Sequence, residues 1–258
     1  RDLTGDWSSD VCSSDLCADG GWILGHLIDG TQAQQVRIPH ADNSLYPIPA
    51  GADEEALVML SDILPTGFEI GVLSGKVKPG DSVVIVGAGP VGLAALLTAQ
   101  FYSPATLIVV DADPNRLEVA KRFGATHTID INVENAVDRI FALTDGVGVD
   151  VAIEAVGIPA SFDTCQEVIA PGGHIANVGV HGKSVELHLE KLWIQNINIS
   201  TGLVNTNTTP MLLKTVQSGK IEPGQLITHR FKLDNILEAY EVFANAAKEK
   251  AIKVILSQ

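Results

Sequence analysis

The amino-acid sequence predicts an α/β protein with a doubly wound parallel sheet. Short runs rich in Val and Ile alternate with stretches of helical periodicity, which is typical of βαβ units whose strands are buried on both faces. A glycine-rich turn, G-A-G-P-V-G, follows the first of these runs and opens a helix. The predicted strands are 81–86, 106–111, 127–130, 150–156 and 174–180, with 197–201 as a candidate sixth.

Helix signals separate these strands. The first helix begins in the glycine-rich turn. Asp113 followed by Pro114 is a typical helix start, and Gly124 is a typical residue just beyond a helix end. The connections between parallel strands should be right-handed crossovers. Two further helices are predicted at 133–144 and 160–170.

The flanking segments have a different character. The segment 17–64 contains turn signals and strand-like pieces such as Q-V-R-I-P. The segment 206–258 predicts helices at 208–218 and 234–247 and a closing strand at 252–256. We therefore expect a doubly wound domain at 65–205, with the two flanks forming parts of one second domain.

Composition narrows the function classes. The 258 residues are 46% hydrophobic, so they can bury one large core or two smaller ones. The net charge of −14 disfavours nucleic acid or an anionic membrane as partner. No apolar run approaches the ~20 residues that span a bilayer, and no signal peptide is visible, so we expect a cytoplasmic protein. Three cysteines are too few for a disulfide framework, and Cys165 is expected to be a buried small side chain.

The glycine-rich turn predicts a dinucleotide-binding loop. Gly87 permits a tight turn, Gly89 lets the backbone approach a pyrophosphate, and Gly92 lets the helix pack closely on the strand. The helix N-terminus, with Pro90 and Val91, offers free N–H groups and a partial positive charge to the phosphates. Glycines that only punctuate a turn are the alternative, which the strand–turn–helix context disfavours.

An acidic residue ends the second predicted strand. Asp111 stands where a carboxylate accepts hydrogen bonds from the ribose hydroxyls of the adenosine. A 2′-phosphate at ~4 Å from it would cost ~4 kcal/mol at an effective dielectric constant of 20, so we predict NAD over NADP. Arg116 could pair with such a phosphate, although we expect it to pack along the adenine or to pair with Asp111.

Four stretches together resemble the zinc-dependent alcohol dehydrogenases of the medium-chain dehydrogenase/reductase family. They are D-G-T-Q-A-Q-Q-V-R-I-P (29–39), S-D-I-L-P-T-G-F (61–68), V-G-A-G-P-V-G-L (86–93) and P-G-G-H-I-A-N-V-G-V (171–180). The resemblance implies a Rossmann domain together with remnants of a mostly β, GroES-like catalytic domain. It also implies NAD and zinc as cofactors and a small alcohol, aldehyde or ketone as substrate. Homo-oligomers, dimers or tetramers, are usual in this family.

The resemblance also assigns roles to single residues. Asp62 matches the third protein ligand of the catalytic zinc, and Thr66 lies against the nicotinamide. Cys17 resembles the last cysteine of the structural-zinc lobe. The remaining assignments are to the cofactor: Val178, Gly179 and Val180 at the nicotinamide, Lys253 at the pyrophosphate, and Val156 in the same cofactor-binding set.

Each of these roles has a plainer rival. Asp62 could be a helix cap, Lys253 a solvated strand residue, and Val178 to Val180 core β residues. Cys17 alone establishes no metal site. The seven histidines show no pair at metal-ligand spacing on one recognisable helix.

This sequence departs from the family pattern. The first two catalytic zinc ligands, the start of the proton relay and three structural-zinc cysteines have no match, and Gln34-Gln35 replaces the Glu-Tyr typical of relatives. We therefore expect an N-terminally truncated fragment that binds NAD weakly and oxidises no alcohol. Two alternatives stay open: a zinc-free quinone or enoyl reductase of the same superfamily, and a non-catalytic NAD-binding module. A short-chain dehydrogenase is disfavoured, because no Y-x-x-x-K pair is present.

The first sixteen residues have a separate interpretation. Back-translation of D-W-S-S-D-V-C-S-S-D-L (Asp6 to Leu16) yields codons that resemble a constant part of a short-read sequencing adapter. We interpret 1–16 as an artefactual segment and leave Cys12 out of any metal site.

Overall fold

The computed structural model describes residues 23–258, and these form two compact units. One unit is Ile63–Gly202. The other comprises the described residues up to Asp62 together with Leu203–Gln258. The segment 1–16 and Cys17 lie outside the described residues.

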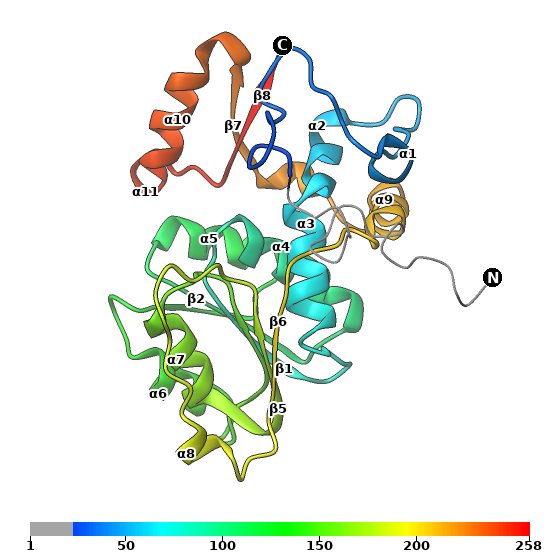
Figure 1. Cartoon of the computed structure of the whole chain (residues 1–258). Coiled ribbons are helices and arrows are strands. Elements are labelled where there is room, and N and C mark those ends of the chain that lie inside the picture. Colours follow the sequence, from blue (N-terminus) through cyan, green and yellow to red (C-terminus); the bar gives the residue numbers. More distant parts are fainter. Residues whose placement is uncertain (1–22) are drawn as a thin grey trace, which may run out of the picture. The chain divides into compact units, whose positions relative to one another are not determined.

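A six-stranded parallel sheet forms the centre of the first unit (Figure 1). The strand order is β3-β2-β1-β4-β5-β6, so the direction of winding reverses between β1 and β4. This confirms the predicted doubly wound fold, including the sixth strand. The strands are β1 (Ser82–Val86), β2 (Thr106–Asp111), β3 (His127–Asp130), β4 (Val149–Glu154), β5 (Ile169–Asn177) and β6 (Asn198–Thr201).

Helices connect the strands and cover both faces of the sheet (Figure 1). The side chain of Asp113 accepts a hydrogen bond from the amide of Asn115, Pro114 occupies the first turn, and Gly124 has φ 100° just after the helix. This confirms the predicted start and end of that helix. The helices are α4 (Pro90–Ala99), extended by η4 (Gln100–Tyr102), then α5 (Pro114–Arg122), α6 (Ala136–Leu143), α7 (Pro159–Val168) and α8 (Leu189–Leu192).

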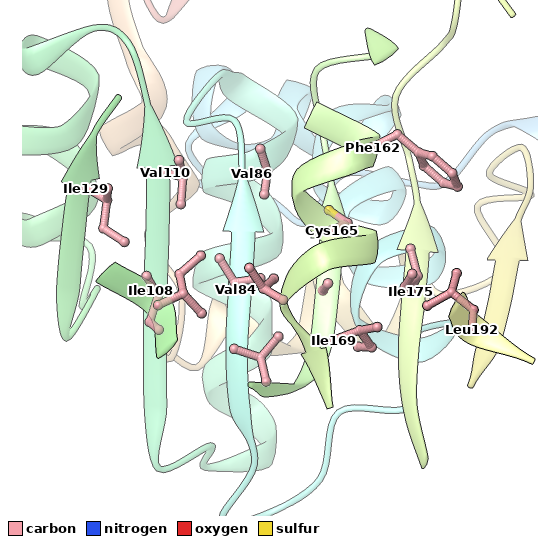
Figure 2. Close-up of a cluster of buried hydrophobic side chains, with 14 residues drawn as sticks. Val84, Val86, Ile108, Val110, Ile129, Phe162, Cys165, Ile169, Ile175 and Leu192 are labelled. Atoms are coloured by element: carbon pink, nitrogen blue, oxygen red, sulfur yellow. The ribbon is translucent and has the colours of Figure 1, made fainter. Parts of the chain in front are cut away.

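The core on the α6–α7 face is a layer of hydrophobic, mostly aliphatic side chains, shown in Figure 2. Val84 and Val86 of β1 and Ile108 and Val110 of β2 alternate toward this face, as the period of two along a strand requires. Burial of each such side chain contributes roughly 1.5–3 kcal/mol. Cys165 on α7 is fully buried in the same cluster, as predicted, and burial together with the Glu154 carboxylate raises the pKa of its thiol.

The fifth strand differs from its prediction. It begins at Ile169 and ends at Asn177, so the helix predicted at 160–170 ends at Val168, and residues 178–180 follow the strand. Pairing of Ile169 with Val149 takes the apolar end of the predicted helix into the sheet, and the register then shifts. The apolar run V-I-A suits a buried helix end and a buried strand equally, so its sequence did not decide between them.

Helices between residues 54 and 73 were not predicted. In the first unit, α3 (Ile63–Thr66) and the π-helical segment η3 (Gly67–Leu73) pack against α4. A Cβ at Gly67 would stand 2.6 Å from the amide nitrogen of Ala95, so only glycine allows this approach. The preceding α2 (Glu54–Leu57) and η2 (Val58–Ser61) belong to the second unit.

The second unit contains a two-stranded parallel sheet of β7 (Ile227–Lys232) and β8 (Lys253–Ser257). The prediction of β8 is confirmed within a residue, whereas β7 was missed. The strand-like piece Q-V-R-I-P is not a strand, and this prediction was wrong. The remaining elements are α1 (Ala41–Ser44), α9 (Thr209–Gln217), η5 (Pro223–Leu226), η6 (Leu233–Asn235), α10 (Ile236–Ala244) and α11 (Ala246–Glu249).

Within residues 23–258, no single helix is long and apolar enough to cross a membrane. Two consecutive helical segments, Glu54–Ser61 and Ile63–Leu73, would be long and apolar enough only when counted as one span.

Candidate functional site

The candidate site lies where the loops after β1 and β4 meet, at the reversal of the strand order. Gly87 has φ 106°, a conformation open to glycine. A Cβ at Gly87 would stand 2.6 Å from Cγ2 of Val156 and 3.0 Å from the carbonyl oxygen of Ala155. The amide of Ala155 donates a 2.9 Å hydrogen bond to the carbonyl of Val86, which holds the two loops together. Ligands of open α/β sheets bind at this kind of position.

Gly89 and Gly92 have different surroundings. Gly89 precedes the first residue of α4, and no atom lies within 4 Å of a Cβ built on it. A Cβ at Gly92 would stand only 1.9 Å from the carbonyl oxygen of Gly87. The fold therefore requires a glycine at Gly92, whereas the space beside Gly89 stays open to a ligand. Pro90 and Val91 are half-buried in the first turn of α4, whose N–H groups point out of the helix end.

Asp111 connects the end of β2 to the glycine-rich loop. Its Oδ2 accepts a 2.6 Å hydrogen bond from the amide of Ala88, and its Oδ1 accepts a 2.8 Å bond from the amide of Asp113. A carboxylate has about four acceptor positions, so two stay available to the hydroxyls of a sugar. The half-buried carboxylate is therefore already oriented before a ligand arrives.

Arg116 has a different partner from the residue predicted. Its Nε lies 3.8 Å from Oδ2 of Asp113, the residue that caps the same helix, so the expected pairing with Asp111 is corrected. The i,i+3 spacing on α5 brings these two side chains together, while Asp111 lies on the strand before the helix.

The loop after β5 forms the second wall. The amides of Val178 and Gly179 donate hydrogen bonds of 2.8 Å and 3.1 Å to the backbone carbonyl of Glu154. Val180 is 88% exposed, and Val156 of the neighbouring loop is 46% exposed. The interpretation of 178–180 as core β residues is therefore wrong, because the strand ends at Asn177, Val178 and Gly179 are half-buried and Val180 is exposed.

Glu154 is a buried carboxylate that sequence reasoning missed. It is the last residue of β4 and is fully buried. Its Oε1 accepts hydrogen bonds from the amides of Val156 (2.9 Å) and Gly157 (2.8 Å) and from the hydroxyl of Ser161 (2.5 Å). A glutamate inside the apolar run D-V-A-I-E-A-V was the available signal, because buried carboxylates need specific partners.

The second carboxylate oxygen of Glu154 faces His181. Nε2 of His181 lies 3.4 Å from Oε2 of Glu154 and 2.8 Å from Oδ1 of Asn177. Oε2 of Glu154 and Nδ1 of His181 are both buried without a hydrogen-bond partner. The ring of His181 also packs edge-on against Phe162, with ring centroids 6.0 Å apart.

Three further predicted site residues belong to other segments of the sequence than these loops. Asp62 is exposed and directly follows η2, and Thr66 is the half-buried last residue of α3. Lys253 is the half-buried first residue of β8. Their assigned roles toward zinc, nicotinamide and pyrophosphate stay predictions, as does the role of Cys17.

A zinc site needs three or four ligating side chains close together. Among residues 23–258, no three His, Cys, Asp or Glu side chains are grouped so that they could hold a metal ion. The described residues by themselves therefore do not fit a zinc ion.

Comparison with known proteins identifies the family. Residues 90–218 match the family described as zinc-binding dehydrogenase. Zinc dependent alcohol dehydrogenase 2 from Streptococcus pneumonia, solved in its apo form, is 61% identical with a TM-score of 0.90, over 96% of this chain and 70% of that chain. An alcohol dehydrogenase from Cupriavidus necator is 36% identical over 88% of this chain, which spans 63% of that relative. A probable NADP-dependent isopropanol dehydrogenase from Mycoplasma pneumoniae is 32% identical, over 92% of this chain and 69% of its own length. The chain therefore belongs to the zinc-binding dehydrogenase family, as a homologue of the zinc-type alcohol dehydrogenases in the medium-chain dehydrogenase/reductase family.

Proposed function

We propose that this chain binds NAD, and that the protein to which it belongs transfers a hydride between a small alcohol and that cofactor, or reduces an aldehyde or ketone in reverse. One observation carries the proposal: the Asp111 carboxylate is held against the glycine-rich loop by the 2.6 Å hydrogen bond from Ala88. A carboxylate held there supports a role as acceptor for the ribose hydroxyls, next to a helix N-terminus of the kind that binds a pyrophosphate. The alcohol dehydrogenase relatives support the reaction class.

The preference for NAD over NADP rests on charge. A 2′-phosphate next to Asp111 would meet a like charge, at a cost of ~4 kcal/mol for ~4 Å and an effective dielectric constant of 20. Arg116 is the cation that could offset this cost, and its Nε lies 3.8 Å from Oδ2 of Asp113 without a hydrogen bond to it. The Mycoplasma relative is described as NADP-dependent, so the cofactor preference needs its own measurement.

Each part of the site has a proposed task. Asp111 accepts hydrogen bonds from the adenosine ribose, the first turn of α4 binds the pyrophosphate, and the exposed side chains of Val156 and Val180 flank the nicotinamide. When bound, the nicotinamide supplies the hydride chemistry, while the protein supplies binding and orientation.

Direct binding tests this proposal. Calorimetric titration of the purified chain with NADH, NADPH and ADP-ribose should show binding of NADH and ADP-ribose and weaker binding of NADPH. The preference is predicted to be at least tenfold, because one uncompensated like-charge contact exceeds about 1.4 kcal/mol. If the chain binds neither NADH nor ADP-ribose, the proposal is contradicted.

The predicted lack of alcohol oxidation by this 258-residue chain stays a prediction. Zinc-dependent NADH formation from a small alcohol would contradict it. NAD binding without activity in a longer homologue would instead favour the non-catalytic module. The zinc-free reductase is the less favoured alternative, because the matching family is a zinc-binding one.

The predicted partners and location also stay proposals. We propose a cytoplasmic homo-oligomer. We also propose that it has no nucleic-acid or anionic-membrane partner, which the net charge of −14 supports. Light scattering would test the oligomeric state, and a salt-dependent binding assay with nucleic acid would test the absence of that partner.

A further inference from the structure

A single buried residue bonds to both loops that the proposed function places at the nicotinamide. Glu154 has no solvent exposure, and a buried carboxylate is costly unless donors surround it. The chain after β4 supplies them: the amides of Val156 and Gly157 and the hydroxyl of Ser161 all converge on Oε1, at 2.5–2.9 Å. The side chain of Glu154 thereby holds the loop that carries Val156.

The loop after β5 is bound to the same residue. Two of its amides, those of Val178 and Gly179, donate to the backbone carbonyl of Glu154. A Cβ at Gly179 would stand 2.3 Å from Oε2 of Glu154, so the loop lies directly on the carboxylate. Any change in the size or hydrogen-bonding character of that oxygen acts on residues 178–181.

Hydrogen-bond logic assigns the proton on His181. The side-chain amide nitrogen of Asn177 donates to the carbonyl of Gly179 at 3.0 Å, so its Oδ1 faces His181 as an acceptor. With the Asn177 amide in this orientation, Nε2 of His181 is assigned the hydrogen that it donates to Oδ1 of Asn177. The same nitrogen lies 3.4 Å from Oε2 of Glu154, an oxygen that has no hydrogen-bond partner of its own.

We propose that Glu154 and His181 form a positioning pair for the nicotinamide half of the cofactor. The pair sets the spacing between the loop of Val156 and the loop of Val180 without touching the adenosine. The adenosine half depends on a different carboxylate, Asp111 at the end of β2. This inference rests on the proposed function, and it predicts that the two halves of the cofactor respond differently to changes at Glu154.

Glu154→Gln tests the pair at nearly constant volume. The amide retains an acceptor for the three donors on Oε1, but it places an NH₂ donor where Oε2 lies 3.4 Å from Nε2 of His181, a nitrogen that itself acts as a donor. His181→Phe is the second variant, since it retains a ring against Phe162 and removes both ring nitrogens. Glu167→Gln on the exposed side of α7 is the matched control.

Binding of NADH and ADP-ribose is measured by calorimetry for each folded variant, with near-ultraviolet circular dichroism to check the fold. We expect Glu154→Gln and His181→Phe to weaken NADH binding about fivefold or more, because one mispaired buried polar group costs about that factor or more. ADP-ribose, which lacks the nicotinamide, should bind within about twofold of wild type, a change too small to reflect a lost contact. Glu167→Gln should change neither affinity.

Three outcomes overturn the pair. Equal losses of NADH and ADP-ribose affinity indicate a general structural role, and unchanged affinity for both indicates no role. If Glu154→Gln fails to fold, normal NADH binding by His181→Phe overturns the proposal. The proposed function fails separately, and first, if the wild-type chain binds neither ligand.

Discussion

The amide of Ala88 donates a 2.6 Å hydrogen bond to Oδ2 of Asp111, which ties the turn after β1 to the last residue of β2. The other carboxylate oxygen accepts from the amide of Asp113, so the side chain is held from two sides. The carboxylate proposed to bind the adenosine ribose thus also holds the loop proposed to bind the pyrophosphate.

Replacement of Asp111 by alanine should weaken NADH binding by about 10- to 100-fold, because charge-assisted acceptors contribute about 1.5–3 kcal/mol. It should also bring the affinities for NADH and NADPH closer together, since the like charge that opposes a 2′-phosphate is gone. Calorimetric titration with both cofactors measures this change. Asp138→Ala, at an exposed position of α6, is the control. An unchanged NADH-to-NADPH ratio would show that Asp111 does not determine the preference.

Replacement of Gly92 by alanine should destabilise the fold. The added Cβ would stand 1.9 Å from a backbone oxygen of Gly87, which no side-chain rotation can relieve. We expect a loss of about 3 kcal/mol or more in the free energy of unfolding, measured by urea denaturation. Gly182→Ala, where no atom lies within 4 Å of the added Cβ, should stay near wild type. Equal stability of the two variants would contradict the packing argument.

Replacement of Gly89 by alanine should separate binding from folding. The backbone φ of −69° suits alanine, and the space around the new Cβ is open. Stability should change by less than about 1 kcal/mol, while NADH affinity should fall by about tenfold or more, because the methyl group narrows the approach of a pyrophosphate to the backbone. Denaturation and calorimetry on the same preparation measure both effects. Undiminished binding would place the pyrophosphate elsewhere.

His174 should make stability fall at mildly acidic pH. Burial, and then the positive charges of Lys76 and Lys78, lower the pKa of His174, while Asp81 acts in the opposite direction. An unfolded chain therefore takes up a proton near pH ~6.5 before the folded protein does, so this residue lowers the free energy of unfolding as the pH falls below that value. Above it, both states are neutral and the contribution vanishes.

Two variants check the sign of this effect. His174→Gln should reduce the loss of stability between about pH 7 and about pH 5, measured by denaturation at each pH. Lys76→Gln should raise the pKa of His174 in an NMR titration, because one repelling charge is removed. A lower pKa of His174 in Lys76→Gln would contradict this account of the pKa. The same pH dependence of stability in His174→Gln and wild type would contradict the role of His174.

Local signals predicted much of the first unit. The strand 106–111 and the helix from Pro114 to Arg122 were both found, because alternating apolar residues, an Asp cap and a C-terminal glycine act within a few residues of each other. The predictions failed where local signals were ambiguous. The apolar run around Ile169 joined the sheet rather than the helix, and residues 227–232 became a strand although they were not predicted as one.

The sequence by itself determined the chain order of the six strands in the first unit, the glycine-rich turn and the position of Asp111, since each depends on residues close together in the chain. Only the tertiary structure decided that Glu154 and His181 face each other and that Arg116 pairs with Asp113 rather than Asp111. The Glu154–His181 contact depends on the parallel register of β4 and β5, which places the loops after the two strands side by side. That register is set by packing across the whole sheet, and no short segment of sequence encodes it.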